Sequence, residues 1–107
     1  PMASVGGESQ VYRPGKGITL PSAVYQERAD YTPEAMQKKI QGNVVMAVVV
    51  LETGDVGDVQ IRHSLDAEYG LDREAVIAVK QWKFRPGMKE GQPVAVEIFV
   101  QMTFALK

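Results

Sequence analysis

The feature that most constrains the fold is an alternating run of residues near the end of the sequence. From residue 94 to residue 106 every even position is apolar, whereas the odd positions include Glu97 and Gln101. A period of two is typical of a β-strand with one face on the core. Such a strand lies inside a sheet or leaves a row of backbone N–H and C=O groups free at its edge, where another chain can pair. The even positions are Val94, Val96, Ile98, Val100, Met102, Phe104 and Leu106.

A second apolar segment predicts a partner for this strand. Val44–Leu51 is apolar on both faces and rich in β-branched residues, which is typical of a central strand. The turn that follows contains Gly54, which supplies a positive φ. Val56–Ser64 then alternates between polar and apolar residues, with Val59 on the dry side together with Ile61. We therefore expect a hairpin whose first arm lies in the middle of the sheet.

Two segments have the signals of helices. Thr32 is suited to an N-cap, Pro33 to the first helical position, and Gly42 to the left-handed stop of a first short helix. A second helix is predicted within residues 70–82, where apolar residues recur at helical spacing and Asp72 is the expected N-cap.

The order of these elements predicts the topology. A hairpin followed by a helical crossover puts the terminal strand beside the first arm, on the side away from the second arm. Trp82 and Phe84 then point the same way and seat the end of the helix on the sheet. The sequence thus predicts an α+β fold, a three-stranded antiparallel sheet with two helices packed on one face. The terminal strand Val94–Leu106 is expected at the edge.

The chain length suits one domain, which we place at residues 18–107. Residues 1–17 contain several glycines and no basic or apolar leader pattern, so we expect a flexible lead-in or a remnant of cloning. On this interpretation the natural protein continues upstream, with any anchor or targeting signal there. The longest apolar run, Val44–Leu51, is far shorter than the ~20 residues that span a bilayer.

Composition argues against several functional classes. The net charge of −1 provides no field to attract nucleic acid, so we expect no nucleic-acid partner. The absence of cysteine excludes disulfides and thiolate catalysis. His63 is the single histidine and fits a surface position at a strand end, with a ligand or pH role as the less favoured alternative. We expect no metal, no cofactor and no enzymatic activity.

Five segments follow one another along the chain: YTPEA, VVVLETGDVGDVQI, LDREAVIAVKQWKFRPG, GQPV and MTFAL. In this order they resemble the TonB C-terminal domain family. The resemblance covers about residues 18–107, with Thr32 between Tyr31 and Pro33 where the family commonly has tyrosine and proline adjacent. It implies a periplasmic domain whose full-length protein is held in the inner membrane by an upstream helix and coupled there to a proton-driven motor complex. Within these segments the matching residues include Leu71, Asp72, Trp82, Phe84 and Pro86.

The resemblance also implies what the domain binds. Members capture the TonB box, a short extended segment of a TonB-dependent outer-membrane transporter, by strand addition at the sheet edge, and thereby transmit energy for uptake. A loop before the first helix contributes contacts, which here implies Arg28, Asp30, Tyr31 and Pro33. The edge strand it implies comprises Val94, Val96, Glu97, Ile98, Phe99, Val100, Gln101, Met102, Thr103 and Phe104.

Two alternatives use the same edge. A TolA-like or other envelope interaction domain would bind a different peptide there. Two copies of this chain can also pair through the terminal strand as a homodimer, because an unpaired edge of this length is an association site.

Overall fold

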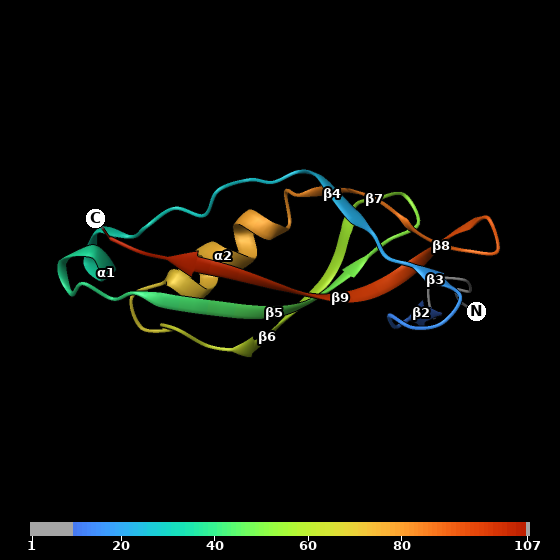
Figure 1. Ribbon diagram of the computed structural model, residues 1–107. Helices are drawn as coiled ribbons and strands as arrows, with labels where there is room; N and C mark the ends of the chain where they lie inside the picture. The colour runs from blue at the N-terminus through green and yellow to red at the C-terminus, as the bar shows by residue number, and fades with distance from the viewer. Residues whose placement is uncertain (1–9, 107) are drawn as a thin grey trace, which may run out of the picture.

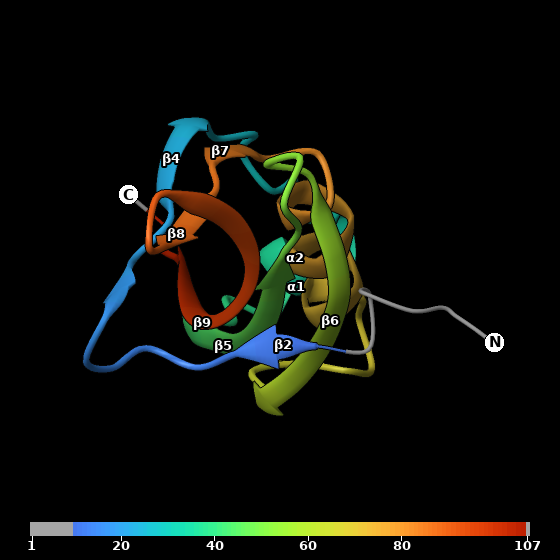
Figure 2. The same cartoon turned by 90° about the vertical axis from the view of Figure 1, so that its right-hand side faces the viewer.

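The computed structural model describes residues 10–106, and Figures 1 and 2 show two views of it. Its helices are α1 (Pro33–Gln37) and α2 (Leu71–Val79). No helix in this part of the chain is long and apolar enough to cross a membrane. The strands are β2 (Val11–Tyr12), β3 (Ile18–Thr19), β4 (Ser22–Tyr25), β5 (Gly42–Val50), β6 (Val56–His63), β7 (Lys83–Arg85), β8 (Gly87–Lys89) and β9 (Gln92–Phe104).

The three long strands are antiparallel and lie in the order β9, β5, β6, as predicted. The β5–β9 ladder runs without a register shift from Gly42 opposite Phe104 to Val50 opposite Val96. The position of β5 in the middle follows from its composition, since its side chains are buried on both faces of the sheet. The predicted central strand is confirmed.

Both helices pack on one face of this sheet, which Figure 2 shows in end view. Ala35 of α1 and Leu71 of α2 belong to the same buried cluster as Met46 of β5. The even-numbered residues of β9 from Val100 to Phe104 complete this cluster, so the predicted dry face is the one that meets the helices.

The sheet is larger than the three strands predicted. A hairpin turn with positive φ at Glu90 and Gly91 pairs β8 with the start of β9, and β3 pairs with β8. With β2 on β9, the sheet has six strands, and β4 and β7 form a separate pair. These additional strands have two to four residues each, too few for a period of two to be visible in the sequence.

The tip of the β5–β6 hairpin is held against β7. Gly54 has a φ of 89°, as its place in the turn predicted, and its carbonyl accepts a 2.9 Å hydrogen bond from the Phe84 N–H. A Cβ at this glycine would lie 2.2 Å from the Phe84 carbonyl oxygen. Phe84 is buried and its ring lies 6.1 Å from that of Trp82, so these two aromatic residues do join the end of α2 to the sheet.

The start of α1 agrees with prediction and its end does not. Thr32 is the N-cap, with its Oγ1 accepting from the Ala35 N–H at 3.2 Å, and Pro33 opens the helix. The helix ends at Gln37, and Lys39 takes the left-handed conformation with a φ of 57°. The predicted stop at Gly42 is wrong, because that glycine already begins β5.

The predicted N-cap of α2 is also wrong. The cap is Gly70, with a φ of 94°, and Asp72 lies one residue inside the helix. The Asp72 carboxylate accepts hydrogen bonds from the N–H groups of Leu65 and Asp66, both at 3.0 Å, and from the Ser64 hydroxyl. Asp72 thus holds the connection that precedes the helix, which leaves the cap to a glycine that tolerates positive φ.

Part of the expected lead-in belongs to the sheet. Residues 1–9 of that stretch lie outside the described residues. Val11 and Tyr12 form β2, parallel to β9. An ion pair of 3.5 Å between Arg13 and Glu97 adds to this contact, and the Lys89 ammonium lies 4.7 Å from the centre of the Tyr12 ring.

Candidate functional site

One side of β9 pairs with β5 from Val96 to Phe104, and the other side is paired only near the start of β9. Gln92–Val94 pairs with β8 there, and Ala95 and Val96 pair with β2. From Glu97 to Phe104 no strand of residues 10–106 pairs with this side. We call this stretch the open edge. The predicted edge is thus shorter than expected, since Val94 and Val96 already have partners.

The open edge is a regular ladder template. Its register with β5 is unbroken, so every second residue directs its N–H and C=O groups away from β5. Buried side chains on the helix side alternate with exposed ones on the other side, where Phe99 is 67% exposed. Val100, Met102 and Phe104 are buried, Gln101 and Thr103 are exposed, and Glu97 and Ile98 are half-buried.

An extended segment, Gln26–Tyr31, follows β4 and leads to α1, and we call it the strap. Figure 1 shows it as the long trace between these two elements. The Trp82 Nε1–H donates to the Glu27 carbonyl at 2.9 Å. At the other end the Tyr31 ring packs edge-on against that of Phe104, with centroids 5.5 Å apart, and its hydroxyl donates to the Ile40 carbonyl.

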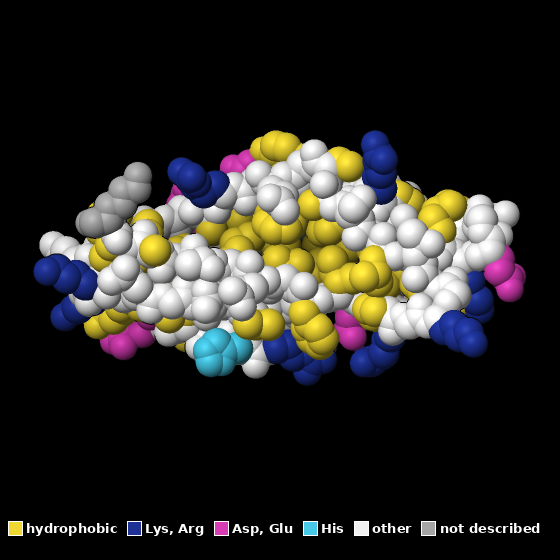
Figure 3. Space-filling model, in the orientation of Figure 1, with side chains coloured by type: hydrophobic (Ala, Val, Ile, Leu, Met, Phe, Trp, Pro, Cys, Tyr) yellow, Lys and Arg dark blue, Asp and Glu magenta, His cyan; other side chains and the backbone are white. Residues whose placement is uncertain are grey.

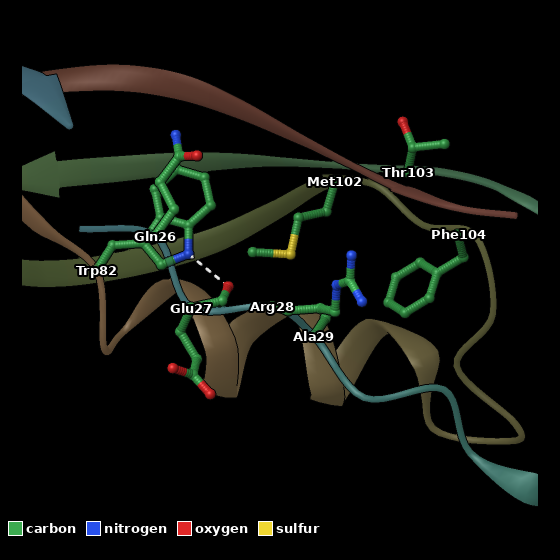
Figure 4. A pocket seen from close by; sticks show the side chains of 8 residues that line it. All are labelled: Gln26, Glu27, Arg28, Ala29, Trp82, Met102, Thr103 and Phe104. Atoms are coloured by element: carbon green, nitrogen blue, oxygen red, sulfur yellow. Dashed lines mark hydrogen bonds between the residues drawn. The ribbon is translucent and has the colours of Figure 1, made fainter. Parts of the chain in front are cut away.

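A groove separates the strap from the end of the open edge. It consists of two hollows of about 310 Å³ and about 460 Å³, which share Arg28 and Ala29 on the strap side and Thr103 and Phe104 on the β9 side. Figure 4 shows Met102 and Phe104 extending from β9 toward the strap. Figure 3 shows apolar atoms exposed at the bottom of the central hollow. We call this feature the strap groove.

Three of the four predicted loop contact residues line the strap groove, and the fourth does not. Arg28, Asp30 and Tyr31 line the strap groove, and the side chains of Arg28 and Asp30 are exposed. Pro33 opens α1 and does not line either hollow. The structure therefore brings together most of the loop named by the resemblance and the last residues of β9.

Sequence reasoning missed the participation of Gln26, Glu27 and Ala29, and it assigned Trp82 to packing alone. Trp82 lines the groove and also fixes the strap. The available signal was the indole N–H, which needs a hydrogen-bond partner when it is partly buried. The strap itself has a hydrogen bond next to the groove, since the Tyr25 hydroxyl donates to the Glu27 carboxylate, and this bond raises the pKa of Tyr25.

The remaining motif residues hold the scaffold around the site. Leu71 is buried in the core, and Phe84 lies beneath the hairpin tip. Pro86 joins β7 to β8. His63 is exposed at the end of β6, away from the strap groove. Chemically, the groove combines open backbone hydrogen-bonding groups with an apolar floor, which suits an extended peptide.

Comparison with known proteins identifies the family of this chain. Residues 27–106 match the family model of the Gram-negative bacterial TonB protein C-terminal region. The chain is 36% identical over 76 residues to a Protein TonB of Xanthomonas campestris pv. campestris, covering 71% of this chain and 34% of that protein. It is 35% identical over 88 residues to the Protein TonB of Vibrio cholerae, covering 82% of this chain and 35% of that protein.

A solved structure has the same fold. The solution NMR structure of the Pseudomonas aeruginosa TonB CTD superposes with a TM-score of 0.66 at 22% identity, covering 87% of this chain and 90% of that one. The chain spans about a third of the length of the curated relatives named above, 34% and 35%. The family match extends from the strap to the end of the open edge, and the chain belongs to the TonB C-terminal domain family.

Proposed function

We propose that this domain binds the TonB box of outer-membrane transporters by adding it as a strand to the open edge. The observation that carries the proposal is the unpaired side of β9 from Glu97 to Phe104, among the described residues, next to a groove with an apolar floor. A guest strand there gains main-chain hydrogen bonds from β9, and its alternate side chains enter the groove.

The expected affinity is modest. Each main-chain hydrogen bond contributes about 0.5–1.5 kcal/mol net, and a guest strand forms several of them with every second residue of the open edge. The ordering of the guest opposes this gain. A complex of this kind forms and releases readily, which suits a transducer that engages transporters in cycles.

The role of the whole protein is part of the same proposal. The domain works in the periplasm, an upstream segment anchors the protein in the inner membrane, and a proton-driven motor complex there supplies the energy. The domain acts as a binding and transmitting module, with no catalytic step of its own. Family membership supports this assignment.

The experiment is an NMR titration of the isotopically labelled chain with TonB-box peptides from transporters of the same genome. A scrambled peptide of identical composition controls for sequence. The amides of Val56–His63, at the other edge of the sheet, control for unspecific strand pairing. We expect chemical-shift changes concentrated in Glu97–Phe104 and the strap. These changes should saturate with the box peptide and not with the scrambled peptide.

Two results would contradict the proposal. Equal shifts with the scrambled peptide would mean that the edge does not select the box. The absence of any shift at saturating peptide would redirect the search to an envelope partner of the TolA type. Sedimentation velocity on the same samples tests self-pairing, because a dimer through the open edge should dissociate as the peptide binds.

A further inference from the structure

The strap has the side-chain pattern of a strand, although it belongs to no ladder. Glu27, Ala29 and Tyr31 are half-buried, whereas Gln26, Arg28 and Asp30 between them are exposed. Ala29 and Tyr31 pack against the core cluster. This alternation places the strap's backbone N–H and C=O groups sideways, in the directions that a β-ladder uses.

These backbone groups are largely unused within the described chain. Among residues 10–106 no backbone N–H from Gln26 to Tyr31 donates to another protein group, and the Glu27 carbonyl accepts from the Trp82 indole. The same holds for the outward groups of the open edge, which face no strand of that part of the chain. Two rows of free main-chain groups thus border one groove.

The groove between the two rows has a third wall of apolar side chains. Met102 and Phe104 extend into it from the helix side of β9, and Trp82 closes one end beside Gln26 (Figure 4). A chain lying there covers the apolar atoms visible at the bottom of the hollow in Figure 3.

We propose that the strap is the second wall of a clamp, and that a guest strand lies between β9 and the strap with main-chain hydrogen bonds to both. This inference rests on the proposed function, because its occupant is the same extended peptide. The guest becomes an interior strand, with β9 on one side and Gln26–Tyr31 on the other. Its affinity then depends on the strap backbone as well as on the open edge.

This geometry defines the chemistry of the occupant. Residues whose side chains point into the groove meet Met102, Phe104 and Trp82 and should be apolar at alternate positions. The intervening side chains face solvent beside Arg28 and Asp30. Proline is excluded from the paired stretch, because both rows require donors from the guest.

Amide hydrogen exchange of the wild-type chain, free and with excess TonB-box peptide, tests the clamp directly. Exchange in both Glu97–Phe104 and Gln26–Tyr31 should slow by about tenfold or more on binding. Slowing in Glu97–Phe104 alone would overturn the clamp and leave the proposed function intact. Slowing in neither segment would overturn both.

Two proline variants provide an independent test. Successive N–H groups of an extended segment point to opposite sides. Ala29→Pro and Asp30→Pro therefore remove one donor that faces the groove and one that faces away. The affinities of the two variants should differ by about threefold to tenfold, and the weaker variant is the one that loses the donor facing the groove.

Asp30→Ala measures the effect of losing the carboxylate alone, and the affinity of Asp30→Pro is compared with that of Asp30→Ala. The chemical shifts of β5 establish that each variant is folded, since that strand lies at the centre of the sheet. Wild-type affinity in both proline variants would overturn the clamp, because the guest would then take no hydrogen bond from the strap.

Discussion

The strap and the connection between β6 and α2 are both irregular, but they use their backbone groups differently. In the connection, residues 64–70, the carboxylate of Asp72 accepts from the N–H groups of Leu65 and Asp66. The carboxylate of Asp66 in turn accepts from Tyr69 and Leu71. In the strap, the side chain that reaches the backbone is the Trp82 indole.

This difference separates a structural connection from a binding segment. Buried carboxylates satisfy the connection from within, which fixes one conformation and leaves few groups for a partner. The strap is fixed near its two ends, and its intervening N–H groups remain available on the groove. A segment that binds by main-chain pairing must keep such groups free.

The largest effect is expected for Asp72→Ala. This change removes the acceptor of three hydrogen bonds at a site where Asp72 is 9% exposed, and it leaves the buried N–H of Asp66 unpaired. The free energy of unfolding should fall by about 2–4 kcal/mol. Urea denaturation followed by circular dichroism measures it.

Glu27→Ala on the strap is the matched control, since the hydrogen bond that the Glu27 carboxylate accepts from the Tyr25 hydroxyl is exposed to solvent. Its unfolding free energy should change by less than about 0.5 kcal/mol. Equal losses in the two variants would remove the distinction between the connection and the strap.

The same carboxylate predicts an acid dependence of stability. Burial of Asp72 opposes its charged form, but the hydrogen bonds from Asp66, Ser64 and Leu65 and the charge of His63 outweigh it and hold the pKa of Asp72 below its ordinary value of 3.8. A lowered pKa in the folded state means stability that is present above pH 3.8 and is lost as the pH falls through the folded-state value.

Asp72→Asn should therefore be less stable than wild type at neutral pH. The difference in unfolding free energy between the two proteins should become smaller as the pH falls below 3.8. Denaturant titrations of both proteins at several pH values measure this difference. A constant difference would show that the charge of Asp72 contributes nothing to the connection.

A smaller effect is expected for Thr32→Val, which acts where the two regions meet. The Thr32 hydroxyl donates to the Tyr69 carbonyl at 2.7 Å and accepts from the Ala35 N–H. Removing it at nearly constant volume should cost about 1 kcal/mol. Thr19→Val, on an exposed position of β3, is the control and should change stability by less than about 0.5 kcal/mol. Thermal unfolding compares the two variants.

The smallest effect is expected for Trp82→Phe, which keeps an aromatic ring and deletes the bond to the Glu27 carbonyl. Stability should fall by about 0.5–1 kcal/mol. Hydrogen exchange should speed up in the strap, while the amides of Leu65 and Asp66 keep their wild-type rates. Faster exchange in both regions would mean that the indole stabilises the whole domain and not the strap in particular.

The segments with long, regular residue patterns were predicted correctly. The alternation from residue 94 to 106 identified β9 and its dry face, and the apolar run from Val44 identified the central strand. The short strands were not predicted, because segments of two to four residues are too short to show a period and their pairing depends on distant chain segments. Asp72 was assigned to the wrong position because an aspartate near a helix start can accept from the helix or from the preceding loop.

The candidate site was predicted in part for the same reason. The alternation of apolar residues predicted the strand that forms the edge, and the family resemblance predicted Arg28, Asp30 and Tyr31 as contact residues. Which stretch of the edge stays open depends on β2, whose partner lies more than eighty residues away, Val11 opposite Ala95. The bond between Trp82 and Glu27 likewise joins residues 55 positions apart. Local sequence contains no signal for contacts of this range.

The pairing of β5 with β9 also sets the order in which the domain folds. The β5–β6 hairpin is local and can form early, but its central strand opposes residues that come much later, Gly42 facing Phe104. Closing such a long loop is slow because its entropy must be lost before the contacts form. Until β9 pairs with β5, one edge of this apolar strand has no partner strand. An intermediate with this hairpin formed and β9 still unpaired exposes an apolar edge strand, which is the kind of surface through which chains aggregate.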